Sequence, residues 1–490
     1  MSNIVGILKK EGLYITISDI INNYGKEYYN KFKTRFTMQT YNMVSKQYKI
    51  IKLFKVINNT YILVPRFEGA KLKIIDNILN KINNETKINL VYNGKLLNNQ
   101  QIVINYIMND IFTESNKVRG TSGCILKLLA GGGKSYCAMH LIGKLNVKTL
   151  IITPNTYLLK QWVQILTEGF PNNTIGEYYS KKKTDGDIVV SIINSCLLKS
   201  YPFNKVNKIE QPELTIKEYF NRFDFVILDE CHMYCTKSFG EVFHRIQSTY
   251  MLGLSATPDE RLDGFDLMAQ YHIGDIIDAE TIEHYSKSDV KFDSNVKIIK
   301  YDGPDEYTQN VINVKNNMIN VPQMISNFII DEKRNKLIIN ETMKLLNKKH
   351  NIFIFSDRRG HLELLAELFE SVLPDSYQII LYGGSSDDDI QVAQENSKII
   401  LTTYQYSSTG VSISKLDALI LATPRRNGLT QIIGRIHRLD ERYQTKRRQI
   451  IDIVDNKTVL KFQYTTRKKA YEKRGCKIKT VIKNHIDIEL

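Results

Sequence analysis

Cysteine is scarce in this chain and is not arranged to bind a metal. The six cysteines among the 490 residues are scattered, at Cys124, Cys137, Cys196, Cys231, Cys235 and Cys476. No CxxC pair with a matching histidine cluster provides four ligands, and Cys231 and Cys235, with His232 between them, are too few on their own. We therefore expect reduced thiols in an intracellular protein, and no zinc.

Long hydrophobic runs are also missing. No apolar segment approaches the roughly 20 residues that a membrane-spanning helix needs. The first residues, MSNIVGILKKEG, lack the basic region and apolar core of a secretory signal. We expect a soluble, intracellular protein with no membrane partner.

Acidic residues are too few to balance the basic ones. Asp and Glu number 52 against 67 Lys and Arg, which gives a formal net charge of +15. Such an excess favours a polyanionic partner, because neutralising phosphates releases their counterions. A merely basic soluble protein fits the charge equally well.

What the sequence does have is a regular alternation of strand-like and helix-like segments. From about residue 123, short apolar runs alternate with amphipathic runs, and a second such series begins near residue 331. This predicts the α/β class, with two tandem domains of parallel sheet flanked by helices. The expected parts are an N-terminal accessory domain (1–90), a first α/β domain (91–277), a connector (278–330), a second α/β domain (331–460) and a basic tail (461–490). For the tail, a solvated helix is the alternative.

A glycine-rich segment, LLAGGGKS, joins the first strand of the alternating series to the next helix. Backbone N–H groups of such a turn can surround a phosphate, Lys134 can reach the β- and γ-phosphate oxygens, and Ser135 can ligate Mg²⁺. Leu128 stands where the usual pattern has its first glycine, so a purely structural turn is the alternative. The residues predicted to bind nucleotide here are Leu128, Leu129, Ala130, Gly131, Gly132, Gly133, Lys134 and Ser135.

Two further apolar runs end in polar residues. FDFVILDECH ends a predicted buried strand with Asp229 and Glu230. One carboxylate can hold Mg²⁺ and the other can polarise an attacking water, although a solvated acidic turn is the alternative. In GLSATP, Ser255 and Thr257 can hydrogen-bond the acidic motif and link the nucleotide state to movement.

The second α/β domain carries the segment QIIGRIHR on a helix predicted over LTQIIGRIHRL. Arg435 and Arg438 are three residues apart and Gln431 lies one turn earlier, which places them on one helix face. Paired arginines can stabilise charge on a transferring phosphoryl group. A basic helix face that touches nucleic acid or solvent is the alternative.

Taken in order, GGGKS, TPNTYLLKQW, DECH, SATP, FIFSD, LTTYQYSSTG and QIIGRIHR resemble the motifs of a superfamily 2 helicase, over roughly residues 95–455. LGLSATPDERLDGFDLMAQYHIG is similar to the group that contains the XPB and UvsW helicases. The chain also resembles helicases of large DNA viruses, such as the poxvirus helicase that releases transcripts. The resemblance implies two RecA-like domains, with ATP and Mg²⁺ as cofactors, and loops of this superfamily commonly lack the first glycine.

The resemblance also implies roles for individual residues. Gln100 would recognise adenine, with a surface amide as the alternative, and His232 would couple the two domains, with a packed neighbour as the alternative. The catalytic residues would be Lys134, Asp229, Glu230, Arg435 and Arg438, with Glu230 as the general base and Gln431 completing the nucleotide site. The Mg²⁺ ligands would be Ser135 and Asp229, and the coupling residues His232, Ser255 and Thr257.

Nucleic acid in this superfamily lies across both domains and is held mostly through its phosphates. The matching positions here are Pro154, Asn155, Thr402, Thr403 and Gly410. Trp162, the only tryptophan, could stack on a base, but burial on a helix face with Leu158 and Leu159 is the simpler expectation. Ser412 stands where many relatives have an aspartate, which puts a contact to the ATP ribose in doubt.

The motifs together predict an ATP-dependent nucleic-acid helicase or translocase. DNA is favoured over RNA, the pathway is transcription or genome maintenance of a large DNA virus, and the transcription machinery is a further candidate partner. A P-loop kinase or metabolic NTPase is disfavoured by the second α/β domain, the paired arginines and the positive charge. An ATP-gated clamp that remodels a nucleic-acid or polymerase complex with little strand separation needs the same motifs and remains open.

Overall fold

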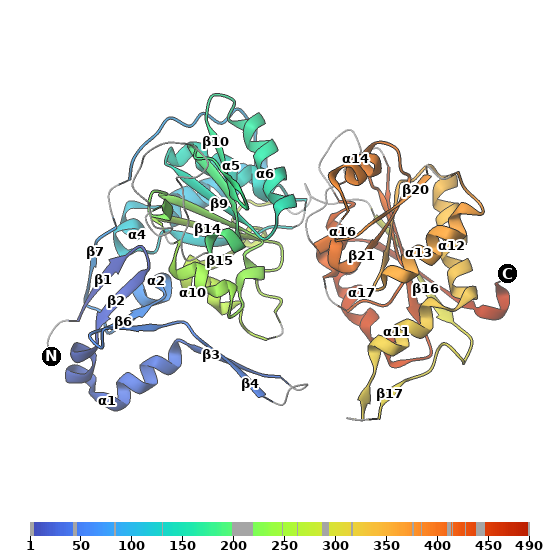
Figure 1. Ribbon diagram of the computed structural model, residues 1–490, viewed down its shortest axis with the longest axis horizontal. Coiled ribbons are helices and arrows are strands. Elements are labelled where there is room, and N and C mark those ends of the chain that lie inside the picture. Colours follow the sequence, from blue (N-terminus) through green and yellow to red (C-terminus); the bar gives the residue numbers. More distant parts are fainter. Residues whose placement is uncertain are drawn as a thin grey trace. The chain divides into compact units, whose positions relative to one another are not determined.

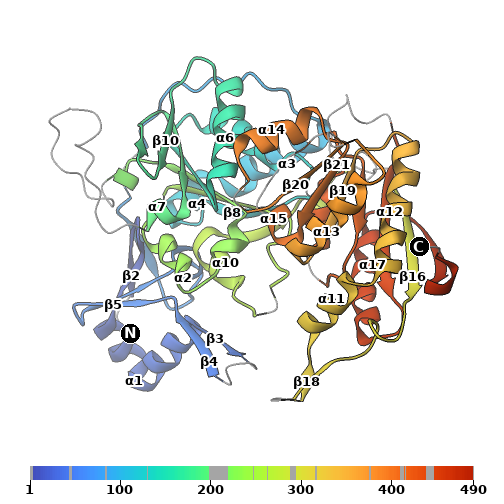
Figure 2. The ribbon, with the colours of Figure 1, turned by 45° about the vertical axis from the view of Figure 1, so that its right-hand side comes forward.

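The computed structural model describes residues 4–42, 47–82, 85–129, 131–197, 219–246, 248–261, 263–286, 294–314, 317–374, 377–383, 385–408, 413, 415–426, 428–437 and 446–488. The chain divides into two units, one formed by residues 1–128 and 133–286 and the other by residues 129–132 and 287–490. Figures 1 and 2 show the elements of both units. In the described part of the chain, no helix is long and apolar enough to cross a membrane.

The N-terminal part of the first unit combines a five-stranded sheet, in the order β5-β6-β2-β1-β7, with a separate antiparallel ribbon of β3 and β4. The strand β7 pairs with β1 in parallel, and the other neighbours in the sheet are antiparallel. The elements are β1 (Val5–Lys9), β2 (Gly12–Thr16), α1 (Ile17–Arg35), β3 (Thr37–Asn42), β4 (Gln47–Lys52), β5 (Lys55–Ile57), β6 (Tyr61–Val64), α2 (Arg66–Ala70) and β7 (Asn77–Asn80).

The rest of the first unit is built on an eight-stranded sheet in the order β11-β10-β12-β9-β13-β14-β8-β15, parallel except for the pair β10–β11. Its central strands are buried along their length, as expected where helices cover both faces. The strands are β8 (Gly123–Lys127), β9 (Thr149–Thr153), β10 (Ile175–Tyr179), β11 (Lys182–Lys183), β12 (Ile188–Ile192), β13 (Phe225–Asp229), β14 (Tyr250–Ser255) and β15 (Asp275–Asp278). The helices are α3 (Asn98–Tyr106), a π-helix (Ile107–Ile111), α4 (Glu114–Arg119), α5 (Lys134–Leu145), α6 (Thr156–Gly169), α7 (Ile193–Cys196), α10 (Leu267–Ile273) and the short 3₁₀ turns Cys231–Tyr234, Phe239–His244 and Ala279–Thr281.

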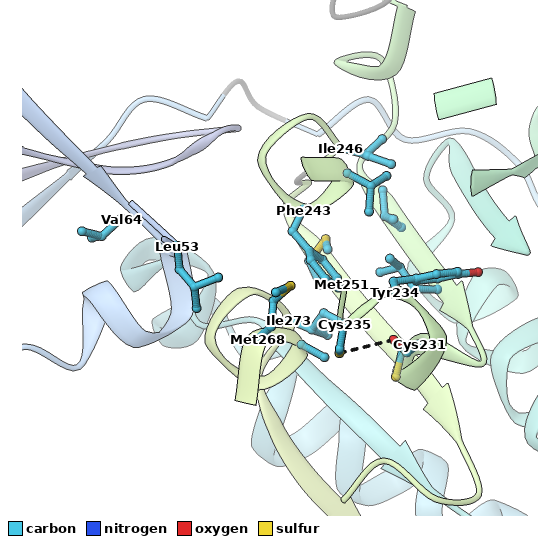
Figure 3. Close-up of a cluster of buried hydrophobic side chains, with 14 of the residues drawn as sticks. Leu53, Val64, Cys231, Tyr234, Cys235, Phe243, Ile246, Met251, Met268 and Ile273 are labelled. Atoms are coloured by element: carbon cyan, nitrogen blue, oxygen red, sulfur yellow. Dashed lines mark hydrogen bonds between the residues drawn. The ribbon is translucent and has the colours of Figure 1, made fainter. Parts of the chain in front are cut away.

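One hydrophobic core joins the N-terminal part to the eight-stranded sheet. Figure 3 shows Leu53 and Val64 in the same buried cluster as Met251, Met268 and Ile273. The boundary predicted near residue 90 therefore does not separate two units, because apolar side chains from both sides of it are buried together.

The second unit is built on a seven-stranded, fully parallel sheet in the order β20-β21-β19-β22-β23-β16-β24. The strands are β16 (Ser294–Asp302), β19 (Ile352–Ser356), β20 (Gln378–Leu381), β21 (Ile399–Thr403), β22 (Ala418–Leu421), β23 (Arg448–Asp455) and β24 (Lys477–Asn484), with a separate hairpin of β17 (Ile312–Asn313) and β18 (Met318–Ile319). The helices are α11 (Val321–Ile329), α12 (Glu332–Asn347), α13 (Arg359–Glu370), α14 (Asp387–Glu395), α15 (Tyr404–Ser408), α16 (Leu429–Gly434), α17 (Gln463–Lys473) and the 3₁₀ turns Val459–Phe462 and His485–Asp487. Two tandem parallel sheets flanked by helices confirm the predicted fold class.

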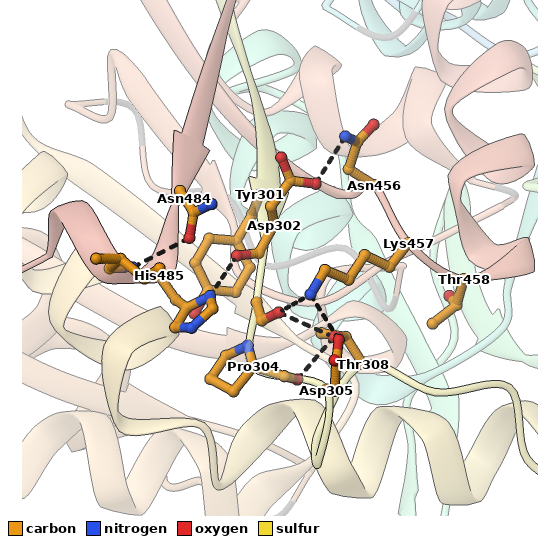
Figure 4. A network of polar contacts seen from close by, with 12 residues as sticks. Tyr301, Asp302, Pro304, Asp305, Thr308, Asn456, Lys457, Thr458, Asn484 and His485 are labelled. Carbon is orange, nitrogen blue, oxygen red and sulfur yellow. Dashed lines mark hydrogen bonds and ion pairs between the residues drawn. The ribbon is translucent and has the colours of Figure 1, made fainter.

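The second sheet includes segments that the sequence analysis placed outside it. The strand β16 comes from the predicted connector and β24 from the predicted tail, and the two pair in parallel with each other. A polar network holds their carboxyl ends together: Asn456 Nδ2 donates to Asp302 Oδ1 (2.8 Å), and His485 Nδ1 lies 2.9 Å from Asp302 O (Figure 4). The predictions of a connector and of a tail are therefore wrong for the residues of β16 and β24. Each of these strands pairs with strands from a distant part of the sequence, and a local pattern does not reveal such pairing.

Candidate nucleotide site

The candidate site lies at the carboxyl edge of the eight-stranded sheet. The strands β9, β13, β14 and β8 are consecutive neighbours and run in parallel. They end next to Pro154, Asp229, Ser255 and Leu128 respectively. Residues that are up to 127 positions apart (128 to 255) in the sequence are thus brought to one edge, which is where open parallel sheets bind ligands.

The loop after β8 has the backbone of a phosphate-binding turn. Gly131 and Gly133 have φ angles of 87° and 88°, a left-handed conformation that favours glycine, and Gly133 directly precedes α5. Lys134 is the first residue of α5, and its Nζ donates to Leu128 O (3.2 Å). The side chain of Leu128 is buried and its N–H donates to Ser255 O (3.3 Å), so this position does not require a glycine.

Gln100 lies against this loop and is not a surface amide. The residue is only 7% exposed, and its Oε1 accepts a hydrogen bond from Leu97 N (3.0 Å). A Cβ atom on Gly133 would come within 2.2 Å of Gln100 Nε2. The last glycine of the loop therefore leaves room for the amide of Gln100 beside the start of α5. Ser135 is half-buried in the first turn of α5, Leu129 is half-buried, and Ala130 lies outside the described residues.

Asp229 is a buried carboxylate with two hydrogen bonds. Its Oδ1 accepts from Glu230 N (3.0 Å) and its Oδ2 from Trp162 Nε1 (2.9 Å). Burial, helped by the neighbouring charge of Glu230, raises the pKa of Asp229 to about 6, although the bond from Trp162 and the charge of Lys134 act in the opposite direction. Such a carboxylate would be stabilised by a cation.

Glu230 has a left-handed backbone, with φ of 48°, which is uncommon for a residue with a side chain. Its Oε2 is shielded from solvent and has no hydrogen-bond partner among the described residues; His232 Nδ1 lies 3.4 Å away. A strained residue with an unsatisfied carboxylate oxygen is typical of a functional position.

Ser255 connects the acidic motif to the segment that follows β14. Its Oγ lies 2.9 Å from His232 Nδ1 and accepts a hydrogen bond from Thr257 N (3.0 Å). Burial, together with Arg261 and Lys134, lowers the pKa of His232 to about 4, so the imidazole is neutral near pH 7. The hydrogen bond that the sequence predicts between GLSATP and the acidic motif is therefore present.

Trp162 is the residue of this site that the sequence analysis did not identify. Its burial, at 2% exposed, agrees with the simpler expectation, but the hydrogen bond to Asp229 was not expected. A buried indole N–H usually needs an acceptor, and that need was the available signal. The sequence could not name the acceptor, because α6 and β13 meet only in the folded sheet.

Asn155 and Pro154 begin the helix that carries Trp162. The side chain of Asn155 accepts from Leu158 N (2.9 Å) and caps α6, and Pro154 is half-buried. Asn155 thus has a structural role beside the predicted contact to nucleic acid.

In the second unit, α16 contains Gln431 and ends at Gly434, with Arg435 as its half-buried C-cap. The helix predicted to continue through both arginines is therefore too long, because Arg435 N and Ile436 N bond to carbonyls three residues back. Arg438 lies outside the described residues, so the shared helix face is not seen.

Two threonines of the second unit behave differently. The side chain of Thr402 is buried in β21, at 1% exposed, and its contact with nucleic acid stays a prediction. Thr403 Oγ1 accepts from Tyr406 N (3.2 Å) at the start of α15. Gly410 lies outside the described residues.

Comparisons with known proteins identify the family of this chain. Residues 70–260 match the family model "Type III restriction enzyme, res subunit". A protein of African swine fever virus, QP509L, whose name describes an ATP-dependent RNA helicase, is 32% identical over 71% of this chain and 68% of its own length. A protein of Acanthamoeba polyphaga mimivirus, L396, with a name of the same kind, is 27% identical over 86% of this chain and 76% of its own.

A solved structure with a similar fold is also found. The DNA-bound restriction-modification enzyme LlaBIII matches 79% of this chain and 31% of its own, with a TM-score of 0.51 and 14% identity. UvsW of phage T4 matches 99% of this chain and all of its own at a TM-score of 0.36, which is too low to support an argument.

The fold defines a protein with two RecA-like parallel sheets, and the glycine-rich turn before α5 is its candidate phosphate-binding loop. With its viral relatives, the chain belongs to the superfamily 2 helicases of large DNA viruses, and it is an ATP-dependent helicase.

Proposed function

We propose that this helicase binds Mg-ATP at the carboxyl edge of the eight-stranded sheet and uses hydrolysis to move along nucleic acid. The observation that carries the proposal is the meeting of three features there: the left-handed glycines before α5, Lys134 at its first residue, and the buried Asp229 followed by the half-buried Glu230. No one of them would suffice, but each supplies a different part of phosphoryl-transfer chemistry.

Each residue has a distinct role in the proposed site. Lys134 and the N-terminal end of α5 bind the phosphates, and Ser135 and Asp229 hold Mg²⁺, which supplies positive charge on the phosphate oxygens when bound. Asp229 suits this role because burial raises its pKa despite the charge of Lys134, so a bound cation would stabilise its charged form. Glu230, with its unsatisfied Oε2, takes the proton from the attacking water.

Further residues recognise the base and respond to hydrolysis. Gln100 binds adenine from its place beside Gly133. Ser255, Thr257 and His232 transmit the nucleotide state through their shared hydrogen bonds. In the second unit, Gln431, Arg435 and Arg438 are the candidates for contacting the phosphates.

The proposed movement is along nucleic acid, and an experiment distinguishes DNA from RNA as the substrate. The sequence analysis favours DNA, in transcription or genome maintenance of a large DNA virus, whereas the names of the two viral relatives favour RNA. ATPase activity measured side by side with single-stranded DNA, duplex DNA and single-stranded RNA separates them. ATP-driven separation of a labelled duplex, compared with ATP-dependent binding alone, separates a helicase from a remodelling clamp.

Glu230→Gln tests the chemistry directly. Because a general base typically contributes at least about 10²-fold, we expect nucleic-acid-stimulated turnover to fall by that factor or more while Mg-ATP still binds. Glu283→Gln, at an exposed carboxylate of the same unit, is the matched control. Near-normal turnover in a folded Glu230→Gln protein would contradict the assignment of Glu230 as the general base. If no polynucleotide stimulates the ATPase of the wild type, the proposed movement along nucleic acid is wrong.

A further inference from the structure

One face of the ribbon of β3 and β4 is buried at Met38 and Ile51, although Lys49 and Gln47 further along that face are exposed. Successive residues of a strand point to opposite faces, and the register pairs Met38 with Ile51 and Tyr41 with Tyr48. Met38 and Ile51 are 9% and 6% exposed and belong to the core of the first unit. The ribbon extends away from the five-stranded sheet in both ribbon views (Figures 1 and 2).

The opposite face presents aromatic and apolar side chains to solvent. Tyr41 and Tyr48 are 49% and 64% exposed, and their ring centroids are 5.1 Å apart. Ile50, one pair further along this face opposite Gln39, is 48% exposed. Apolar side chains that gather on one exposed face can form a binding surface.

The charge around the ribbon selects the kind of partner. Residues 28–67 contain eight Lys or Arg and no Asp or Glu. Three of these cations pair with acids outside that stretch, namely Lys31 with Glu27, Arg35 with Glu68 and Lys55 with Glu241.

The two described lysines of the ribbon itself are not neutralised in this way. Lys49 and Lys52 form no ion pair within the described residues; Lys49 Nζ lies over the ring of Phe265, 5.2 Å from its centroid. Lys52 is exposed and lies on the same face as the two tyrosines. The charge of Lys49 acts on Asp263, so the exposed face combines aromatic rings with the positive charge of Lys52.

We propose that this exposed face, formed by Gln39, Tyr41, Tyr48, Ile50 and Lys52, binds single-stranded nucleic acid. Unpaired bases stack on Tyr41 and Tyr48, and phosphates lie near Lys52. A duplex offers no free base faces along its length, so the surface discriminates in favour of single strands. The inference deepens the proposed function, on which it rests, by adding a contact outside the two parallel sheets.

The full-length double variant Tyr41→Leu/Tyr48→Leu tests the proposal, because leucine keeps an apolar surface and removes the ring. Stacking lost from one or two bases should weaken binding of labelled oligo(dT) or oligo(rU) by about five-fold or more. The loss of affinity caused by the tyrosine substitutions should persist at high salt. The loss caused by Lys52→Gln should become smaller as the salt concentration rises, because it comes from a contact to phosphate. Tyr41→Phe/Tyr48→Phe should bind like the wild type.

The matched control is Tyr24→Leu. Tyr24 is 39% exposed and also stacks on a neighbouring tyrosine, Tyr28, but on α1. Tyr24→Leu should leave the binding of single strands unchanged. None of the variants should alter the melting temperature or the ATPase rate measured without nucleic acid.

The outcomes separate this inference from the proposed function. Suppose that nucleic acid stimulates the wild-type ATPase but Tyr41→Leu/Tyr48→Leu binds single strands normally. The proposed binding face is then wrong, and the proposed helicase function is unaffected. An equal loss of duplex and single-strand binding would also overturn stacking. If no polynucleotide stimulates the wild type, the proposed function itself fails.

Discussion

At the scale of single residues, the environment of Asp229 decides what the acidic motif can do. The carboxylate is buried beside Glu230, and its Oδ2 accepts a hydrogen bond from the only tryptophan of the chain. The same helix, α6, starts at a position predicted to contact nucleic acid, with Asn155 as its N-cap. Trp162 is thus a positioning residue that links this helix to the proposed metal site.

Trp162→Phe removes the N–H donor and keeps a buried ring. Because hydrogen bonds to charged groups typically contribute about 1.5–3 kcal/mol, the pKa of Asp229 should rise further, and the Mg²⁺ concentration for half-maximal ATPase should increase by about ten-fold. A Mg²⁺ titration of ATP binding and of turnover measures this. Tyr157→Phe, which removes a hydroxyl from the same helix, should leave the requirement unchanged. An unaltered Mg²⁺ requirement in Trp162→Phe would contradict the positioning role.

At the scale of elements, the last 30 residues show how far sequence pattern can be trusted. The basic composition of 461–490 favours a tail or a solvated helix, yet α17 is held to β23 and β24 completes the sheet. The bond between Arg467 Nε and Asp452 Oδ2 measures 2.8 Å, with both side chains 1% exposed, and Tyr471 donates to the same oxygen. The sequence does not show whether a charged residue on a helix faces water or a buried carboxylate.

Asp452→Asn should therefore destabilise the second unit. Leaving Arg467 buried without its counter-charge costs about 3 kcal/mol or more, which should lower the urea midpoint of the second unit seen by far-UV circular dichroism. Fluorescence of Trp162, which lies in the first unit, should keep its midpoint. Glu472→Gln breaks only the exposed pair with Lys468 and should cost less than about 0.5 kcal/mol. Equal stabilities of the two variants would show that the buried pair is not needed.

At the scale of the whole molecule, the N-terminal part and the eight-stranded sheet behave as one unit because they share a core. His244 and His272 lie in this unit with rings 4.7 Å apart. Burial lowers the pKa of His244 to about 4 and that of His272 well below its usual value. Both are therefore neutral in the folded state.

The stability of the first unit should fall as the pH drops below about 6.5. The unfolded chain binds more protons than the folded one between the folded and unfolded pKa values, so acid favours unfolding. At pH 5, His244 alone should cost about 2 kcal/mol. Thermal unfolding followed by Trp162 fluorescence at pH 7 and pH 5 measures this.

Two histidine variants control the pH experiment. His272→Gln should reduce the pH dependence, whereas His284→Gln, at an exposed histidine, should not. A melting temperature of the first unit that is the same at pH 5 and pH 7 would contradict the prediction.

The sequence by itself determined the local features of this protein. The alternation of apolar runs predicted the central strands of both sheets, and GGGKS predicted the loop, because strand periodicity and the backbone freedom of glycine are properties of neighbouring residues. The order of the motifs was enough to identify the helicase family.

Only the tertiary structure decided which distant groups meet. It placed Gln100 against Gly133, bonded Trp162 to Asp229, and brought β16 and β24 into one sheet. These contacts join segments whose local patterns do not encode their partners. Burial then set the pKa of Asp229 and His232, because desolvation depends on everything that surrounds a side chain and not on its neighbours in the sequence.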